Sequence, residues 1–451
     1  MHTHTKGLTR REVLQVGYSG ALGLGLPSLL RQRASAADSE SGVQRQESGK
    51  KMILVWTTGA MSHHDTLDMK PDAPAEIRGQ FNPIQTKIPG YLMCEHMPEL
   101  TKIADKFSVV RSFTHKDNNH LMSTHHVLTG QFQPGAFFDK IASRTDWPNY
   151  SGAYDYFNPR NDGIPNGVNL PTYMQQPPLL WPGQYAGLLG AKHDPWQITA
   201  DPNKDDFKVD SLTLAAGLDI QRVTDRQSLL TDLNKQQLRL ERSAVGNRMK
   251  SEQEEAYNIL TSRKLANAFQ VQQESSEVRE RYGRHTTGQS LLLARRLVEV
   301  GVPVVQVNIG NAQNWDNHNN IFPTLKDRLL PPVDKGLAAL LQDLEERGML
   351  EDTFVVLIGE FGRTPKINDK AGRDHWGPCF SALFAGGGVQ GGRVIGESDP
   401  HGGYPVKKPF SPEDFGATVY SVLGIDPASE IRDRFDRPLR LNSGSVISEL
   451  F

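Results

Sequence analysis

Five short runs of apolar residues constrain the fold of this chain more than any other feature. Each run is continuous, whereas a strand with one face in water alternates apolar and polar residues. Continuous runs of this length, bounded by polar and glycine-rich segments, are typical of parallel strands that are buried on both faces. The runs are residues 52–56, 107–110, 302–307, 353–358 and 380–384.

Amphipathic helices are expected between some of these runs. Residues 290–300 carry a group of leucines and end at Gly301. Residues 333–347 carry apolar side chains at positions i, i+4, i+7, i+8 and i+11, which is one buried helical stripe, and end at Gly348. A glycine is favoured just beyond the last helical residue. Helices that alternate with buried strands predict an α/β fold, with a mostly parallel sheet and helices on both faces.

Two other stretches do not follow this pattern. Residues 209–282 are highly charged and have leucines at near-helical spacing, which predicts a helical insertion on the outside of the core. A coiled-coil arm is the alternative, although the heptads are not sustained. Residues 158–196 are rich in Pro, Gly, Tyr and Trp and predict a long ordered loop. Such a loop serves as a lid or wall over a site, or simply as a connection.

The N-terminus has the features of an export signal. Arg10 and Arg11 precede an apolar, Gly-rich stretch, and the small-residue sequence Ala34-Ser35-Ala36 follows it. This order indicates a removable signal peptide, and the paired arginines indicate the twin-arginine route. The apolar stretch is shorter than the ~20 residues of a transmembrane helix, and no other segment reaches that length.

These features predict the domain organisation and the location of the protein. We expect a twin-arginine signal peptide over residues 1–36, a flexible lead-in over residues 37–51 and one domain over residues 52–451. The twin-arginine export machinery is then a partner. The mature protein is expected in the periplasm or outside the cell, with no transmembrane segment.

Charge and cysteine content argue against two classes of protein. The formal net charge is -2 and the pI is near 6.7, so the chain has no basic field for nucleic acid, and we expect no such partner. The two cysteines, Cys94 and Cys379, are too few for a disulfide scaffold and stand in no Cys-rich zinc pattern. Whether the two pair with each other stays open.

Histidines gather next to the ends of the predicted strands, where ligands bind in open α/β sheets. Asp65, Asp316, Glu360 and Asp374 stand beside them. Mixed imidazole and carboxylate ligands suit zinc, manganese or iron. We therefore predict a divalent metal (zinc, manganese, iron or calcium), with a metal-free hydrogen-bond network as the alternative. Eight of the 14 histidines are in these segments: His63, His64, His115, His120, His125, His126, His318 and His375.

Two arginines flank the last of these segments. A guanidinium group such as that of Arg363 or Arg373 can bind phosphate or sulfate through two parallel hydrogen bonds. Each can equally pair with a nearby carboxylate such as Glu360 or Asp374. Both interpretations stay open at this point.

The segment over residues 359–376 resembles the hallmark of a known family. It reads Gly-Glu-Phe-Gly-Arg-Thr-Pro-Lys and then, from residue 372, Gly-Arg-Asp-His-Trp. This pattern is similar to that of domain-of-unknown-function family 1501, whose members are mostly exported bacterial proteins. Further segments fit the family, so that the resemblance extends over residues 52–425; they are residues 62–71, 281–283, 288–297 and 315–318.

The family is distantly related to alkaline phosphatases and sulfatases. This relation implies a similar sheet, with active-site residues on loops at its carboxyl edge and metal ions that stabilise a transferring phosphoryl or sulfuryl group. It also implies that Thr57-Thr58 replaces the first metal-binding aspartates of a sulfatase, that His120 lies near the place of the nucleophile, and that Glu360-Phe361 replaces a ligand pair. Because no cysteine is available for conversion to formylglycine, the sulfatase mechanism is rejected, and the two-metal phosphatase site is incomplete.

Our first hypothesis is an exported, metal-dependent hydrolase that acts on phosphate or sulfate esters of a small molecule or a glycan. Ser62 or His120 would be the attacking group or its activator, and Glu360 a ligand or general base. Arg363 would contribute to catalysis if it binds the anion. The expected metal ligands are His63, Asp65, Asp316, His318, Asp374 and His375.

Two other hypotheses remain. A non-catalytic exported protein that binds anionic or sulfated glycans, or that scaffolds a partner, would explain the missing aspartates and nucleophile. In a purely structural interpretation, the His and Asp clusters brace long loops by hydrogen bonds.

Overall fold

The computed structural model describes residues 18–19, 24–25, 50–133, 142–209 and 263–451. The chain divides into two units, Met1–Gly49 and Lys50–Phe451. In the first unit, β1 (Tyr18–Ser19) pairs with β2 (Leu24–Gly25) in an antiparallel manner. The predicted signal peptide and lead-in lie almost wholly outside the described residues, as does most of the predicted insertion.

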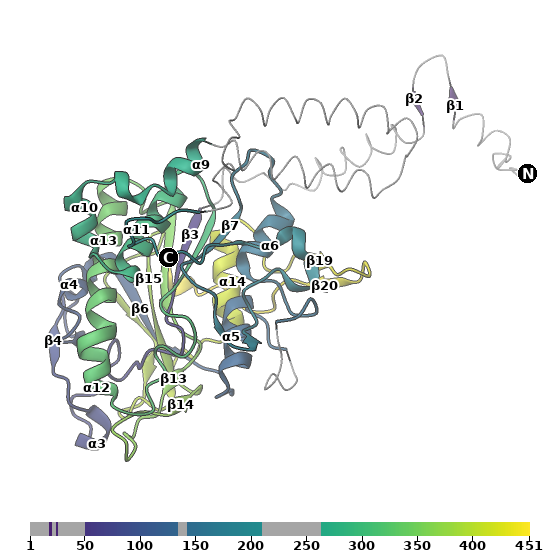
Figure 1. The fold of residues 1–451 in the computed structure, drawn as a ribbon. Helices are drawn as coiled ribbons and strands as arrows, with labels where there is room; N and C mark the ends of the chain where they lie inside the picture. The colour runs from purple at the N-terminus through teal and green to yellow at the C-terminus, as the bar shows by residue number, and fades with distance from the viewer. Residues whose placement is uncertain (1–17, 20–23, 26–49, 134–141, 210–262) are drawn as a thin grey trace, which may run out of the picture. The chain divides into compact units, whose positions relative to one another are not determined.

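An eight-stranded sheet forms the centre of the second unit (Figure 1). All five predicted strands appear close to their expected places. Their small differences lie at the ends, where sequence patterns are least reliable. In spatial order the strands are β10 (Trp196–Gln197), β7 (Gly167–Leu170), β11 (Val304–Asn308), β3 (Lys51–Trp56), β12 (Thr353–Ile358), β15 (Phe380–Ala385), β6 (Phe107–Phe113) and β16 (Arg393–Ile395).

The sheet is mostly parallel, as predicted, but one strand was assigned the wrong direction. β15 runs antiparallel to both of its neighbours, β12 and β6, while the other pairs in the sheet are parallel. A continuous apolar run shows that a strand is buried but not which way it runs. Because β15 is antiparallel to β12, the segment over residues 359–379 that connects them begins and ends at the same edge of the sheet. This is the edge at which the parallel strands have their carboxyl ends.

Helices cover both faces of the sheet (Figure 1). Along β3, Ile53 and Val55 belong to one hydrophobic core, whereas Met52, Leu54 and Trp56 belong to the other. The first core includes residues of α4 (Pro98–Thr101), α11 (Thr286–Glu299) and α13 (Leu330–Glu346). The second includes residues of α5 (His120–Thr129), α6 (Tyr150–Phe157) and α14 (Pro412–Val422).

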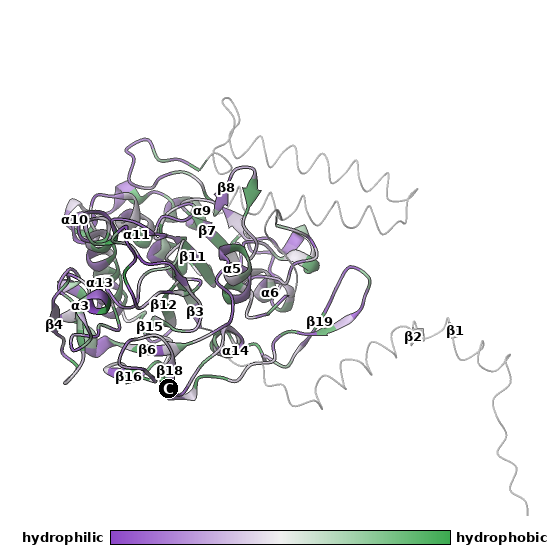
Figure 2. Ribbon diagram, turned by 90° about the horizontal axis from the view of Figure 1, so that it is seen from below, coloured by the Kyte–Doolittle hydropathy of each residue, from purple (hydrophilic) through white to green (hydrophobic). Residues whose placement is uncertain are grey.

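Hydropathy explains this layering. Figure 2 shows hydrophobic colour on strands of the central sheet, whereas the surrounding loops are largely hydrophilic. The helices predicted at residues 290–300 and 333–347 are α11 and α13. α11 begins earlier than predicted because the His285 side chain caps it, accepting a hydrogen bond from the backbone N–H of Gly288.

The prediction of a long loop over residues 158–196 needs correction, because the segment supplies β7 and the start of β10 to the sheet. β7 has the sequence Gly-Val-Asn-Leu, in which a glycine and a buried asparagine interrupt the apolar pattern. The polar Asn169 is satisfied by donating to the carbonyl of Gln184 at 3.2 Å. Sequence periodicity therefore missed this strand.

Shorter elements complete the unit. Within the described residues, no helix is long and apolar enough to cross a membrane. Cys94 and Cys379 are both buried free thiols. The remaining helices and strands are α3 (Ala75–Arg78), α9 (Arg263–Ala268), α10 (Ser276–Tyr282), α12 (Ile321–Thr324), η1 (Ala104–Lys106), η2 (Gly187–Leu189), η3 (Ala191–His193), η5 (Val271–Gln273), η6 (Leu325–Leu329), η7 (Ser448–Leu450), β4 (Pro83–Gln85), β5 (Leu92–Cys94), β8 (Gln175–Gln176), β9 (Leu179–Leu180), β13 (Gly362–Arg363), β14 (His375–Trp376), β17 (Glu397–Ser398), β18 (Pro405–Lys407), β19 (Glu430–Arg432) and β20 (Pro438–Arg440).

Candidate metal centre

Four side chains from three segments meet beyond the carboxyl ends of β11 and β12. His120 is the first residue of α5, and the side chain of Asn119 caps that helix by accepting two backbone N–H groups. Asp316 and His318 lie in the loop that follows β11. His375 comes from β14, which is paired with β13 in the segment between β12 and β15.

Three imidazole Nε2 atoms converge on the Asp316 carboxylate. The Nε2 atoms of His318 and His375 each lie 3.0 Å from Asp316 Oδ1, and His120 Nε2 lies 3.1 Å from Asp316 Oδ2. The two Nε2 atoms of His318 and His375 are 2.9 Å apart. Ligand atoms around a tetrahedral zinc ion are roughly 3.3 Å apart, given metal–nitrogen bonds of 2.0–2.1 Å. The ligand atoms of His120, Asp316 and His375 all lie within 4.8 Å of one another and could therefore hold one ion, and His318 lies beside this group.

The opposite ring nitrogen of each histidine faces an oxygen acceptor. His120 Nδ1 lies 2.7 Å from Glu360 Oε1, His318 Nδ1 lies 2.7 Å from Asp374 Oδ1, and His375 Nδ1 lies 2.8 Å from the Asn118 carbonyl oxygen. Each Nδ1 must therefore carry the proton that it donates, which leaves a lone pair on Nε2 when the ring is neutral. Metal-binding histidines are commonly oriented in this way.

Some positive charge is already present here, because Arg363 Nη1 lies 2.6 Å from Asp316 Oδ1 and hydrogen bonds to Asp316 and Glu360 raise the pKa of His120. Three Nε2 lone pairs and a carboxylate oxygen repel one another at distances near 3 Å unless protons or a cation lie between them. The chemistry of the donor set therefore fits a divalent metal ion, and imidazole with carboxylate favours zinc, manganese or iron over the oxygen-seeking calcium.

Local electrostatics match this conclusion. Burial by itself would raise the pKa of the Asp316 carboxyl, but hydrogen bonds from His120 and His375 and the charge of Arg363 hold that pKa well below its usual range. Burial would likewise lower the pKa of His120, but its hydrogen bonds to Asp316 and Glu360 raise it instead. Asp316 thus stays anionic, as a metal ligand must.

Glu360 supports the centre from a fully buried position. Its Oε1 accepts hydrogen bonds from the Gly59 backbone N–H at 2.9 Å and from His120. Its Oε2 has no hydrogen-bond partner among the described residues. A buried carboxylate oxygen without a partner is costly, so this oxygen is available to a water molecule or to a cation.

The structure favours the interpretation in which Arg363 pairs with a nearby carboxylate over the one in which it binds phosphate or sulfate. The side chain is 0% exposed, and its Nη1 lies 2.6 Å from Asp316 Oδ1. Its remaining donors reach inward to backbone carbonyl oxygens, so the guanidinium has no free donor with which to bind a substrate anion. The carbonyls are those of Gly59, Ala60, Trp315 and Arg373.

Three other predicted site residues form a separate, closed network. The Ser62 hydroxyl donates to Asp65 Oδ2 at 2.6 Å, and Arg373 forms two hydrogen bonds with the same carboxylate at 2.7 and 3.0 Å. His63 Nε2 lies 2.9 Å from the Gly402 carbonyl, and its ring packs against His64. These side chains are all buried, and in the contacts of the described chain none of them reaches the Asp316 group.

An aromatic wall surrounds His120. The Trp181 ring stacks on His120 with centroids 5.4 Å apart, and the Phe361 ring lies 4.9 Å away. Trp181 comes from the segment predicted as a lid, wall or connection, and here that segment acts as a wall. The Asn118 carbonyl was missed, because a backbone acceptor has no residue signature.

One side of the centre is open to water. The His318 side chain is 40% exposed and that of Asp374 is 54% exposed. On the opposite side, Trp181 and Phe361 are both 1% exposed and exclude solvent. A ligand can therefore approach from the side of His318 and Asp374, and catalytic metal sites keep such an open position.

Comparison with known proteins now places the chain. Residues 49–451 match the family described as "Protein of unknown function (DUF1501)". The chain belongs to the DUF1501 family. No curated protein has a matching sequence.

Solved structures similar to this DUF1501 protein include sulfatases and a member of the alkaline phosphatase superfamily. The complex of Ps i-CgsB with k-i-k-neocarrahexaose is 12% identical, with 84% of this chain and 72% of that chain covered and a TM-score of 0.41. The PsFucS1 sulfatase from Pseudoalteromonas sp. is 10% identical, with 88% and 72% covered and a TM-score of 0.38.

A protein in the alkaline phosphatase superfamily from Vibrio parahaemolyticus is also 10% identical, with 84% of this chain and 67% of that chain covered and a TM-score of 0.35. Similarity at this level carries no information about substrate or mechanism, because one fold hosts many chemistries.

Proposed function

We propose that this protein is a metal-dependent hydrolase of phosphate or sulfate esters, with His120, Asp316, His318 and His375 as the metal ligands. The convergence of three Nε2 atoms on one carboxylate, each with its Nδ1 atom held by an oxygen acceptor, carries the proposal. The ester class rests on the resemblance of the sequence motifs to a family related to phosphatases and sulfatases.

A divalent ion at this position would polarise an ester oxygen and lower the pKa of a nearby water molecule. The chain's own residues prepare the site for it. Glu360 orients His120, Asp374 orients His318, and Arg363 balances the charge of Asp316. Trp181 and Phe361 exclude water from the closed side, so the substrate would enter over His318 and Asp374.

This role assignment differs from the sequence-based one at several residues. His120, expected as the attacking group or its activator, becomes a metal ligand, and Arg363 balances the charge of Asp316 and does not bind the substrate. Glu360 and Asp374 become positioning residues that act through histidines. Ser62, which donates to the buried Asp65, is too enclosed to act as a nucleophile, and His63 and Asp65 belong to the closed network.

Elemental analysis of the full-length mature protein tests the proposal. We expect about one equivalent of zinc, manganese or iron in the wild type and its loss in His375→Ala, together with loss of hydrolysis of aryl phosphates or aryl sulfates. His401→Ala is the matched control, because His401 is an exposed histidine away from the centre. Equal metal contents in the wild type and in both variants, or no metal in any, would refute the centre.

The same experiment separates the hydrolase from the alternative function. If the metal is bound and lost as expected but no ester in the panel is hydrolysed, the metal centre stands and the hydrolase proposal fails. Binding of an anionic glycan by that metal-loaded, inactive protein would then favour the non-catalytic function.

We also propose that the protein is exported by the twin-arginine route before it acts. Cleavage after Ala36 leaves 451 − 36 = 415 residues. N-terminal sequencing of the exported protein should begin at Ala37. Replacing Arg10 and Arg11 with lysine should retain the precursor in the cytoplasm, and unchanged export of that variant would contradict the route.

A further inference from the structure

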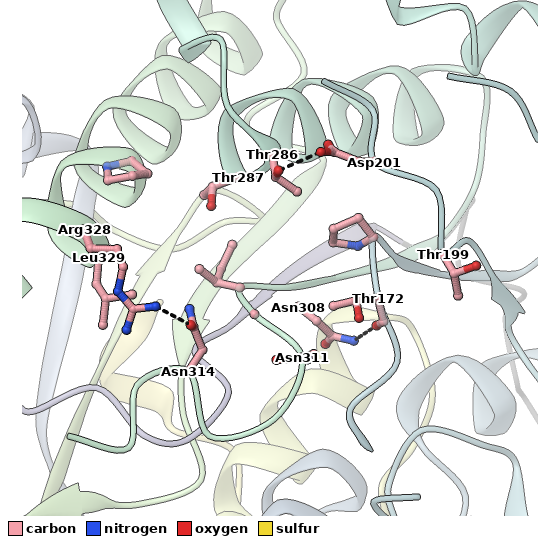
Figure 3. A pocket seen from close by; sticks show the side chains of 14 residues that line it. Thr172, Thr199, Asp201, Thr286, Thr287, Asn308, Asn311, Asn314, Arg328 and Leu329 are labelled. Atoms are coloured by element: carbon pink, nitrogen blue, oxygen red, sulfur yellow. Dashed lines mark hydrogen bonds between the residues drawn. The ribbon is translucent and has the colours of Figure 1, made fainter. Parts of the chain in front are cut away.

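A cavity of about 390 Å³ shares a loop with the candidate metal centre. It is bounded by the residues that follow β7 and β11, by the first turn of α11 and by the turn that leads into α13 (Figure 3). The loop over residues 308–318 supplies Asn308 and Asn314 to this cavity and Asp316 and His318 to the metal centre. The volume of the cavity falls within the range of small-molecule binding sites.

Uncharged hydroxyl and amide side chains make up half of the lining. Threonine and asparagine account for seven of the 14 lining residues, and Asp201 and Arg328 are the two charged ones. This composition is unlike that of the metal centre, where histidines and carboxylates dominate.

Donors and acceptors lie in different parts of the cavity. Figure 3 shows Arg328 beside Asn314, with Arg328 Nη1 donating to Asn314 Oδ1 at 3.2 Å. The Asn314 amide and the rest of the guanidinium carry further N–H donors. In another part of the cavity, the Thr286 hydroxyl donates to Asp201 Oδ2 at 2.9 Å, and that carboxylate can accept more hydrogen bonds.

Asn308 also lines the cavity and lies beside Thr172 (Figure 3). Its side chain is buried, donates to the Thr172 carbonyl at 2.8 Å and accepts from Gln306 at 2.8 Å. With both of its polar atoms already bonded, this asparagine is held in one orientation and does not need to reorganise when a ligand binds.

The chemistry of the lining narrows the class of ligand. A simple anion would be repelled by Asp201, and a simple cation by Arg328. An apolar ligand would leave the threonine and asparagine groups without partners, which is costly. Hydroxyl groups donate and accept at once, so a ligand that carries several of them can satisfy both parts of the cavity.

We propose that this cavity binds a neutral, hydroxyl-rich ligand, namely a sugar unit or a polyol. The ligand donates to Asp201 and accepts from Arg328 and Asn314. This site is distinct from the metal centre, and it does not depend on whether the protein hydrolyses esters.

Ligand-observed NMR on the full-length mature protein tests this proposal, with glucose, galactose, mannose, cellobiose and sorbitol as probes. We expect at least one probe to bind with a Kd of about 1 mM or tighter. In the double variant Asp201→Ala/Asn314→Ala, which removes one proposed acceptor and one proposed donor, the affinity should fall about tenfold. Thr145→Val is the control, because Thr145 is exposed and does not line the cavity.

Two further measurements keep the test decisive. Thr287→Phe fills the cavity and should abolish binding while a folded circular dichroism spectrum is retained. Binding should persist after metal is removed with EDTA, because no proposed metal ligand lines the cavity. Absence of binding by every probe, equal binding by all variants, or loss of binding with EDTA would each overturn the proposal.

Discussion

Two clusters of His and Asp lie beyond the strand ends of this protein and look alike in sequence, but they differ in structure. In the first, Asp65 pairs with Arg373 in a two-pronged contact and accepts a hydrogen bond from Ser62, so the charges of Asp65 and Arg373 are matched. In the second, Asp316 meets three histidines whose Nε2 atoms all point at it. Asp316 also pairs with Arg363, through one contact of 2.6 Å, and our proposal places a metal ion in this second cluster and none in the first.

The two clusters differ in which donor and acceptor atoms remain without a partner. A buried carboxylate paired with an arginine in a two-pronged contact has no remaining need for a metal. Imidazoles whose Nδ1 atoms are already committed still offer a lone pair on the other nitrogen. Residue type is the same in both clusters, so the partner of each atom, and not the residue type, distinguishes a brace from a metal centre.

Breaking the Asp65 cluster should give the largest change in stability. Asp65→Asn removes the partner of the fully buried Arg373 and should cost about 3–5 kcal/mol in the free energy of unfolding. Urea denaturation measures this change. The metal content of the protein that remains folded should equal that of the wild type, and a cost below about 1 kcal/mol would mean that the cluster is not a structural brace.

Lowering the pH should give the next largest change in stability. Burial lowers the pKa of His115 from 6.5 to about 4, although its bond to the Glu360 carbonyl opposes the shift. Between pH 6.5 and about 4, His115 is therefore protonated in the unfolded chain but neutral in the folded chain. Stability from this group is fully present above pH 6.5 and is lost as the pH falls toward 4, by about 3 kcal/mol in total.

Denaturation across this pH window measures the loss. The same series on His115→Gln, which cannot titrate, should show a correspondingly shallower dependence on pH. An identical slope in the two proteins would show that His115 does not supply the acid sensitivity.

Substituting Asp374, at the exposed edge of the Asp316 cluster, should lower metal affinity and leave the stability of the fold almost unchanged. Asp374→Asn weakens the hydrogen bond that orients His318, and such partners typically contribute 10–100-fold to metal affinity. Because the Asp374 side chain is 54% exposed, the free energy of unfolding of the protein should change by less than about 1 kcal/mol in this variant. Competitive chelator titration measures the affinity, and Asp65→Asn is the reciprocal control.

Ser62→Ala should give the smallest effect. It removes one hydrogen bond to Asp65 and should cost about 1 kcal/mol, a little more if the carboxylate oxygen finds no new partner. Metal content and ester hydrolysis should not change. A loss of hydrolysis with intact metal would instead make Ser62 the attacking group and would reverse the comparison.

Much of the fold could be predicted because burial leaves a direct trace in sequence. The runs that became β3 and β12 were found almost to the residue, and the stripe of α13 was found from its spacing. β7 was missed because it is short and contains a buried asparagine. The direction of β15 was missed because an apolar run carries no direction.

The site was predictable in its members more than in its arrangement. His120, Asp316, His318, Glu360, Arg363, Asp374 and His375 were all singled out, and the structure brings them together. The proposal keeps the ligand role that the sequence suggested for Asp316, His318 and His375. The roles of the other four changed, because a role depends on which nitrogen or oxygen faces which neighbour.

The sequence by itself determined which segments are buried and that histidines and carboxylates collect where strands end, since both depend on residue type and order. Only the tertiary structure decided that Asp65 meets Arg373 while Asp316 meets three imidazoles. Those partners lie up to 308 positions apart along the chain, and their pairing follows from the order of the strands and the reversal of β15. Contacts of that range leave no local pattern, because they depend on the packing of the whole sheet.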